Sequence, residues 1–223
     1  MQNYLILKLK GAMQAWGGHT YEDYRPSLDF PTRSGLVGLL GACLGIRHQE
    51  LDKHKLLDKS LRFAVRADER TIPIRKLVDF HTVKNVPRLD GSILNYAVVT
   101  KREYLLDAEF TVVIECINNI NNINNINESD AENGYSLGQI KEAIKKPIFV
   151  PYLGRKSCPI SRPLFEKEVQ ANNFLEALSM VEPNKGVIYS EQEIEGNPNL
   201  VIRDQAIYNG KRHFYKRNIW IKN

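Results

Sequence analysis

A glycine-rich apolar segment at residues 33–46 constrains the fold more than any other part of the chain. Its apolar residues recur at helical spacing, Thr32 or Ser34 can cap its start, and Gly45 can end it. Small residues form a stripe along the segment, namely Gly38, Gly41, Ala42 and Gly45. Each glycine inside a helix costs about 0.5–1 kcal/mol relative to alanine. We therefore expect this helix to offset the cost by packing closely on a sheet.

Short apolar or alternating runs predict the strands of such a sheet. They lie at residues 4–9, 61–65, 72–80, 104–116, 187–189, 200–202 and 214–221. A second helix is expected to open at a capping box made by Ser136 and Gln139. This order of elements predicts an α+β fold with a ferredoxin-like sheet and its helices on one face.

The chain is expected to divide at about residue 150. Residues 1–150 would form the ferredoxin-like domain, and residues 151–223 a smaller β-rich C-terminal region. Between about residues 79 and 103 the strand pattern weakens at Pro87 and at the Asp90-Gly91 pair, which predicts a projecting hairpin. Residues 117–127 repeat Ile-Asn-Asn, a low-complexity pattern typical of a surface insertion, and we assign no function to it.

The charge balance is compatible with nucleic-acid binding without requiring it. The 223 residues include 31 Lys and Arg against 26 Asp and Glu, a formal net charge of +5. Residues 211–223 contain no acid and five cations, namely Lys211, Arg212, Lys216, Arg217 and Lys222. The preceding part of the chain is therefore formally neutral, and the excess charge falls in the tail.

Membrane, secretory and metal-binding signals are lacking in the sequence. No apolar stretch reaches the roughly 18–20 residues of a membrane span, and the start of the chain does not resemble a signal peptide. The three cysteines stand apart from one another, without disulfide or zinc spacing. We expect a cytoplasmic protein with no membrane contact, no metal and no cofactor.

Enzymatic motifs are weak. The five histidines lack the spacing of zinc hydrolases, and the glycine-rich segment lacks the Gly-Lys-Ser/Thr ending of a phosphate-binding loop. Asp79, His81 and Lys84 form the one cluster that would suit metal-independent RNA cleavage, with histidine as general base and lysine stabilising negative charge. A histidine beside an aspartate at a strand end is more often a structural pair. We therefore expect no catalytic residue.

Basic and aromatic residues alternate in several segments, as in proteins that bind single-stranded RNA. In such proteins cations hold the phosphates and flat side chains stack on the bases. The segments contain Trp16 with Arg25 and Arg33, Arg102 with Tyr104, Tyr152 with Arg155 and Lys156, and Phe214, Tyr215 and Trp220 in the tail. Two backbone sites are also expected to suit a phosphate: the helix start at residues 32–34 and the glycine-containing turn at residues 152–157.

Five stretches of the sequence resemble a known protein family. They are residues 13–17, 30–46, 81–83, 102–105 and 151–159. In this order they resemble the CasD family, subunits of the type I-E CRISPR surveillance complex, Cascade, within CRISPR-associated protein family five and the repeat-associated RNA-binding superfamily. The resemblance runs from residue 1 to about 190 and is weakest in the Ile-Asn-Asn repeat, across residues 84–99 and beyond about residue 195. It implies an RNA-recognition-motif-like fold with a thumb-like hairpin.

The resemblance implies a non-catalytic subunit. Members of the family cap the crRNA by holding its repeat-derived 5′ handle, and they join the Cascade backbone subunits to the large subunit. The implied partners are the crRNA 5′ handle, these subunits and, through the assembled complex, target DNA. In another subtype the homologous subunit cleaves RNA with a tyrosine, a lysine and a histidine, a set that is not found here at matching positions.

The resemblance also implies the site residues. Arg102 resembles the family's thumb arginine at the junction of handle and spacer, and Tyr152, Arg155 and Lys156 fall in a loop that contacts handle nucleotides. The complete expected RNA-binding set is Met13, Gln14, Trp16, Arg25, Thr32, Arg33, Ser34, His81, Arg102, Tyr104, Tyr152, Leu153, Gly154, Arg155, Lys156 and Ser157. Lys156 stands where the family usually has arginine, so it keeps the charge but loses the bidentate fork.

Two other functions stay open at this point. One is a metal-independent endoribonuclease that uses His81 to process CRISPR precursor RNA. The other is a free-standing RNA-binding module, which would be a soluble monomer. The motif run and the alternation of basic and aromatic residues favour the Cascade subunit instead.

Overall fold

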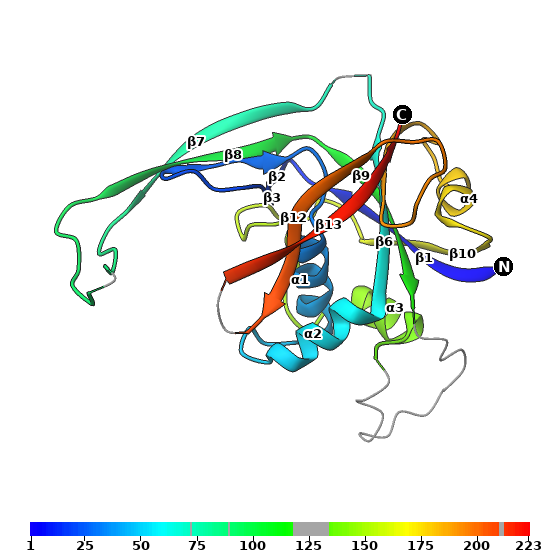
Figure 1. Ribbon diagram of the computed structural model, residues 1–223, viewed down its shortest axis with the longest axis horizontal. Helices are drawn as coiled ribbons and strands as arrows, with labels where there is room; N and C mark the ends of the chain where they lie inside the picture. Colours follow the sequence, from blue (N-terminus) through cyan, green and yellow to red (C-terminus); the bar gives the residue numbers. More distant parts are fainter. Residues whose placement is uncertain (72, 89, 118–133, 210–211) are drawn as a thin grey trace.

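A seven-stranded antiparallel sheet forms the body of the protein in a computed structural model that describes residues 1–71, 73–88, 90–117, 134–209 and 212–223 (Figure 1). The strands are β1 (Gln2–Lys10), β6 (Leu61–Asp68), β9 (Glu109–Cys116), β10 (Phe165–Ala171), β11 (Gly186–Ser190), β12 (Asn199–Tyr208) and β13 (Arg212–Lys222). They lie in the order β10-β1-β9-β6-β11-β13-β12, and every neighbouring pair is antiparallel. The expected combination of helices with a sheet is confirmed, and the structure adds that the sheet is antiparallel. Strands from beyond residue 150 extend this same sheet on both sides, and the division into two regions stays a prediction.

Helices cover both faces of the sheet. The apolar side chains of α1 (Arg33–Leu44) and α3 (Leu137–Lys145) pack with Leu5, Leu7 and Leu9 of β1 in the larger core cluster. The helix α4 (Phe174–Ser179) packs on the opposite face, against Tyr4 and Ile6 of the same strand. The prediction that the helices lie on one face is wrong for α4. Because β1 is apolar on both sides, its second side also needs a cover.

The small residues of α1 have a different role from the expected one. Gly45 ends the helix with a φ of +76°, as predicted. A Cβ on Gly41 would lie 2.9 Å from the His54 ring of α2 (Leu51–Ser60), and one on Gly45 would lie 2.8 Å from Ile148. The small residues therefore allow α2 and the segment after α3 to approach α1, whereas the large apolar residues of α1 face the sheet.

A second, four-stranded sheet forms an arm that projects from the body (Figure 1). Its long strands β7 (Arg75–Val83) and β8 (Val98–Leu106) are antiparallel, and β2 (Met13–Gln14) and β4 (Tyr24–Arg25) pair with the base of β8. A separate small pair consists of β3 (Trp16–Gly17) and β5 (Ser27–Leu28). The hairpin expected at about residues 79–103 corresponds to β7 and β8, which begin earlier, at Arg75.

Two further expectations concern the Ile-Asn-Asn repeat and membrane contact. From residue 118 onward the repeat lies outside the described residues. Within the described part of the chain, none of the helices has both the length and the apolar character needed to cross a membrane.

Candidate nucleic-acid interface

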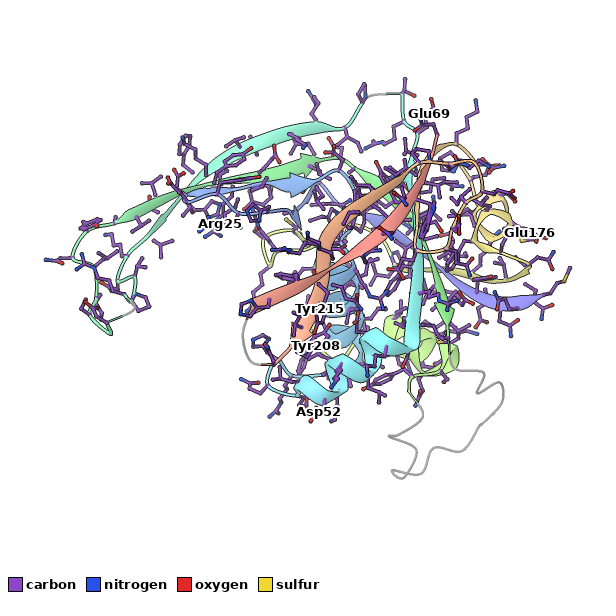
Figure 2. All side chains as sticks on the ribbon, viewed as in Figure 1. Arg25, Asp52, Glu69, Glu176, Tyr208 and Tyr215 are labelled. Carbon is purple, nitrogen blue, oxygen red and sulfur yellow. The ribbon has the colours of Figure 1, made fainter. Side chains whose placement is uncertain are left out.

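The base of the arm brings basic residues from separate segments onto one face. The strand register sets Arg102 of β8 beside Asp79 of β7 on one side and Arg25 of β4 on the other. Residues at paired positions of neighbouring strands point to the same face of a sheet. His81, paired with Thr100, shares this face. Figure 2 shows Arg25 at the base of the arm, where β4 meets β8.

The loop at residues 151–159 closes against this face through Arg155. Its Nη1 and Nη2 atoms donate hydrogen bonds of 3.3 Å to the carbonyl oxygens of Glu103 and Arg25. Its guanidinium carbon lies 4.7 Å from the centroid of the Tyr104 ring, a cation–π distance. Arg155 thus ties the loop to β8 and β4, while the neighbouring Lys156 stays exposed.

Gly154 lets the same loop approach the segment before α1. Its φ is +85°, and a Cβ at this position would lie 1.8 Å from the Ala15 carbonyl oxygen. Next to it, the Leu153 carbonyl accepts a 3.1 Å hydrogen bond from the Ala15 amide. Only glycine fits here without separation of the two segments, so Gly154 acts through loop placement.

Glu103 fixes β4 and the arm to each other from the opposite face of β8. Its buried carboxylate accepts hydrogen bonds from the Tyr24 hydroxyl (3.2 Å) and the Ser27 amide (2.8 Å), and it lies 3.5 Å from Lys76 Nζ. Desolvation and the nearby Glu103 raise the pKa of Tyr24. Desolvation lowers the pKa of Lys76, but Asp29 and Glu103 outweigh it and the pKa is raised overall.

Glu103, which organises the site, is not among the residues predicted from the sequence. The sequence does contain one indication, a single acidic residue between Arg102 and Tyr104 in a predicted strand. Because side chains alternate between the two faces of a strand, this residue points to the opposite face from its two neighbours. Without its partners in view, such an acid looks like any exposed strand residue. In the structure it holds β4, and therefore Arg25, beside Arg102.

His81 is held in place by its neighbours. Its Nε2 atom lies 2.9 Å from Asp79 Oδ2 and 3.2 Å from the Tyr104 hydroxyl oxygen. The pair with Asp79 matches the structural interpretation that the sequence favoured. Tyr104 is buried beneath His81 and Arg155, so its ring is covered. This corrects the expectation that Tyr104 stacks on an RNA base.

Gln14, Trp16 and Leu153 have buried side chains, which corrects further predicted RNA contacts. Trp16 is 1% exposed, and its Nε1 donates a 3.1 Å hydrogen bond to Gln14 Oε1. Gln14 is itself buried and donates a 2.7 Å hydrogen bond to the Ala108 carbonyl. Leu153 is buried in the same core cluster as Trp16. Enclosed side chains with satisfied polar atoms contribute to the core, so Gln14, Trp16 and Leu153 do not reach RNA in this structure.

The start of α1 is closed by a carboxylate from the β12–β13 hairpin. Asp204 Oδ2 accepts a 2.8 Å hydrogen bond from the Arg33 amide, and Thr32 Oγ1 accepts one of 3.2 Å from the Gly35 amide. This corrects the expected phosphate site for Thr32 and Arg33, which are buried, whereas Ser34 stays half-buried. A carboxylate already occupies the positive end of the helix dipole, and a phosphate would have to displace it.

The Arg33 side chain is likewise engaged inside the protein. It is 6% exposed, with Nε 2.7 Å from Asp58 Oδ1 and Nη1 2.6 Å from Glu191 Oε2. Desolvation lowers the pKa of Arg33, but Glu191 and Asp58 outweigh it and the pKa is raised overall. The RNA-binding prediction for Arg33 is therefore corrected to a structural role, since its charge is neutralised by buried acids.

A smaller accessible set remains from the predicted site. Its members are half-buried or exposed: Met13, Arg25, Ser34, His81, Arg102, Tyr152, Gly154, Arg155, Lys156 and Ser157. Four cations of this set lie at the base of the arm, and we call Arg25, Arg102, Arg155 and Lys156 the arm-base cluster.

The basic tail contributes less free charge than its composition indicates, because Arg217 is paired with Asp204 at 2.5 Å and with Glu191 at 3.1 Å.

Comparison with known proteins gives consistent matches along the whole chain. A family model described as CRISPR-associated protein (Cas_Cas5) matches residues 4–218. The chain is 38% identical over 228 residues to the CRISPR system Cascade subunit CasD of Escherichia coli (strain K12), with 99% of this chain and 96% of that protein covered. The resemblance noted from the sequence motifs is confirmed.

Two solved structures are similar in fold and sequence. A chain of a CRISPR RNA-guided surveillance complex superposes with a TM-score of 0.70 at 28% identity, covering 98% of this chain and 89% of that one. A chain in a crystal structure of a Cas protein gives a TM-score of 0.63 at 25% identity, covering 98% of this chain and 93% of that one.

Proposed function

This chain belongs to the CRISPR-associated Cas_Cas5 family, and we propose that it is a non-catalytic subunit of a type I-E Cascade surveillance complex that binds the 5′ handle of the crRNA. The observation that carries the proposal is the match to a Cascade subunit over nearly the full length of both chains. The proposal keeps the cytoplasmic location expected from the sequence. Its partners are the backbone subunits, the large subunit and, through the assembled complex, target DNA.

The chemistry of the arm-base cluster supports RNA as its ligand. Arg25 and Arg102 lie side by side on one face, and Lys156 extends from the adjoining loop. Cations held on a strand and a fixed loop suit the regularly spaced phosphates of a single strand. Half-buried Tyr152 offers a ring beside them. We propose that these residues hold the handle, and that Arg155, Gly154 and Glu103 position them.

The order of the helices and strands supports a ferredoxin-like core. The succession β1, α1, β6, β9, α3, β10 with strand order β10-β1-β9-β6 follows the pattern of a ferredoxin-like unit, with α1 and α3 in one core cluster. We propose that this unit is the RNA-recognition-like core, that the β7–β8 arm is the thumb, and that β11 to β13 form the C-terminal region.

The exposed apolar side chains of the arm favour assembly over a free-standing module. Phe80 is 65% exposed, and Tyr96 and Ile93 are similarly uncovered. Large apolar side chains gathered on a projecting hairpin usually mark a surface that another molecule covers. A subunit whose arm lies against neighbours in a complex explains this exposure, whereas a soluble monomer does not.

We expect the tagged chain, expressed with the other proteins of its complex and a repeat-containing RNA, to co-purify with a guide RNA. Sequencing the 5′ ends of the bound RNA should return one common sequence derived from the repeat. The reason is that a capping subunit selects the handle rather than the variable spacer. Bound RNA with scattered 5′ ends, or a complex that lacks this chain, would contradict the proposal.

We expect the purified chain to leave repeat RNA intact in EDTA, with or without His81→Ala. The His81 Nε2 atom is shared between Asp79 and the buried Tyr104, which holds the imidazole in a structural pair. Denaturing gel electrophoresis of end-labelled RNA measures this. Cleavage that disappears in His81→Ala would favour the endoribonuclease alternative.

A further inference from the structure

A cavity of about 790 Å³ lies on the side of the body away from the arm. It is bounded by the end of β6 with the connection to β7, by α4, and by the turn that leads into β11. Figure 1 shows α4 and the end of β13 on this side, and Figure 2 shows Glu69 there as well. No residue of the arm-base cluster lines it, so it is a separate feature of the molecule.

The walls of the cavity are aliphatic. Half-buried Ile74, Leu175, Val187 and Ile188 line it, and none of its described lining residues is aromatic. RNA bases bind proteins chiefly by stacking on flat side chains. Walls without rings therefore disfavour a nucleic acid and suit aliphatic side chains from another protein.

The floor of the cavity carries buried charge. Arg66 is 1% exposed and Asp68 is 4% exposed, and their Nε and Oδ1 atoms are 2.7 Å apart. Lys8 Nζ lies 2.6 Å from the other carboxylate oxygen, so two buried cations share one acid. Their remaining donors bind the carbonyls of Leu178, Val181 and Glu182. By formal charge these two cations exceed the one acid, with Arg66 and Asp68 in the lining and Lys8 behind it.

The rim adds free positive charge. Arg70, Lys185 and Lys222 line the cavity, and within the described chain none of them forms an ion pair. Asp68 and Glu69 are the acidic side chains among the described lining residues, and Asp68 is already bound by Lys8 and Arg66. Three unpaired cations around an aliphatic hollow, above a positively charged floor, complement a segment that carries both carboxylates and aliphatic side chains.

We propose that this cavity docks an acidic segment of a neighbouring protein subunit. An aliphatic side chain of that segment would enter between α4 and β11, and its carboxylates would meet Lys185, Lys222 and Arg70. This inference rests on the proposed function, because it requires the chain to lie beside other proteins in a complex. It adds a contact surface that is separate from the arm-base cluster.

A cross-linking experiment on the assembled complex tests the contact. The photo-reactive amino acid p-benzoylphenylalanine replaces Ser179, an exposed residue of α4 that lines the cavity. Irradiation should join it to one protein subunit, and mass spectrometry should map the link to a segment that contains Asp or Glu beside Leu, Ile, Val or Met. Cross-links to RNA alone, or none in a complex that retains guide RNA, would overturn the inference.

Charge reversal provides the matched comparison. Lys185→Glu with Lys222→Glu should lower the amount of the cross-linked subunit per guide RNA by about tenfold, since like charges would then face each other. Lys55→Glu with Lys59→Glu makes the same change in net charge on the exposed side of α2 and should retain that subunit. Equal retention by both double variants would also overturn the inference. A wild-type preparation without guide RNA would instead contradict the proposed function itself.

Discussion

Replacing Asp68 by asparagine is expected to lower the free energy of unfolding by about 3 kcal/mol or more. Lys8 and Arg66 are both buried against this carboxylate, at 2.6 Å and 2.7 Å. Removing one partner of a buried pair leaves a charge that neither water nor a counter-ion stabilises, which typically costs about 3–5 kcal/mol. Asparagine keeps the shape of the side chain, but its amide nitrogen donates, so the change removes the charge together with one of the two acceptor atoms that Lys8, Arg66 and Thr111 bind. Urea unfolding followed by circular dichroism measures the loss.

A surface ion pair provides the control for this experiment. Lys145 Nζ lies 3.9 Å from Glu142 Oε1, and the two side chains are 42% and 72% exposed. Pairs of this kind contribute about 0–1 kcal/mol, so Glu142→Gln should change stability little. If Asp68→Asn destabilised the protein no more than Glu142→Gln does, the two cations beneath α4 would not depend on Asp68. The network would then not explain how β1, β6 and α4 are held together.

Local sequence signals predicted the helices well. Thr32 caps α1 through the Gly35 amide, and Gly45 ends it in the left-handed conformation. The capping box of Ser136 and Gln139 has both of its hydrogen bonds. These signals depend on residues within one turn of each other, so the sequence alone contains all that they require.

Side chains whose partners are distant in the sequence could not be predicted in the same way. Arg33 looked like a phosphate ligand, because its acids come from α2, from the segment after β11 and from β12, and Asp204 is 171 residues away. Trp16 sits among loop residues, yet it is 1% exposed and belongs to the same core cluster as Leu153 of the loop at residues 151–159. The net charge of the basic tail was misleading for the same reason, since Arg217 forms ion pairs with Asp204 and Glu191.

The distribution of paired and unpaired cations explains the layout of the proposed subunit. Acids in the interior that connect distant elements of the sheet form ion pairs with Arg33, Arg66 and Arg217. Arg25, Arg102 and Lys156 keep accessible surface at the base of the arm. A formally neutral body can therefore present a basic site, because several of its acids are paired in the interior networks; at the base of the arm Asp79 lies beside Arg102.

Replacing Arg102 and Lys156 together by alanine is expected to weaken handle binding roughly 10- to 100-fold, because a hydrogen bond contributes about 0.5–1.5 kcal/mol net and two such contacts are lost. The dependence of affinity on salt should also become less steep. Each phosphate contact on single-stranded RNA contributes about 0.7 to the slope of log affinity against log salt. Losing both contacts should reduce the slope by about 1.4. Fluorescence anisotropy of a labelled RNA with the co-purified 5′ sequence, across a salt series, gives both quantities.

Replacing Arg102 and Lys156 tests contact with RNA rather than folding of the protein. Arg155 is left in place because it donates to the carbonyls of Glu103 and Arg25, and its loss would disturb the loop as well as the charge. Lys55→Ala with Lys59→Ala removes two charges from α2 and should leave affinity and slope close to those of the unaltered chain. If the two double variants behaved alike, the reduced affinity would reflect net charge alone. The handle would then have to bind elsewhere than at the base of the arm.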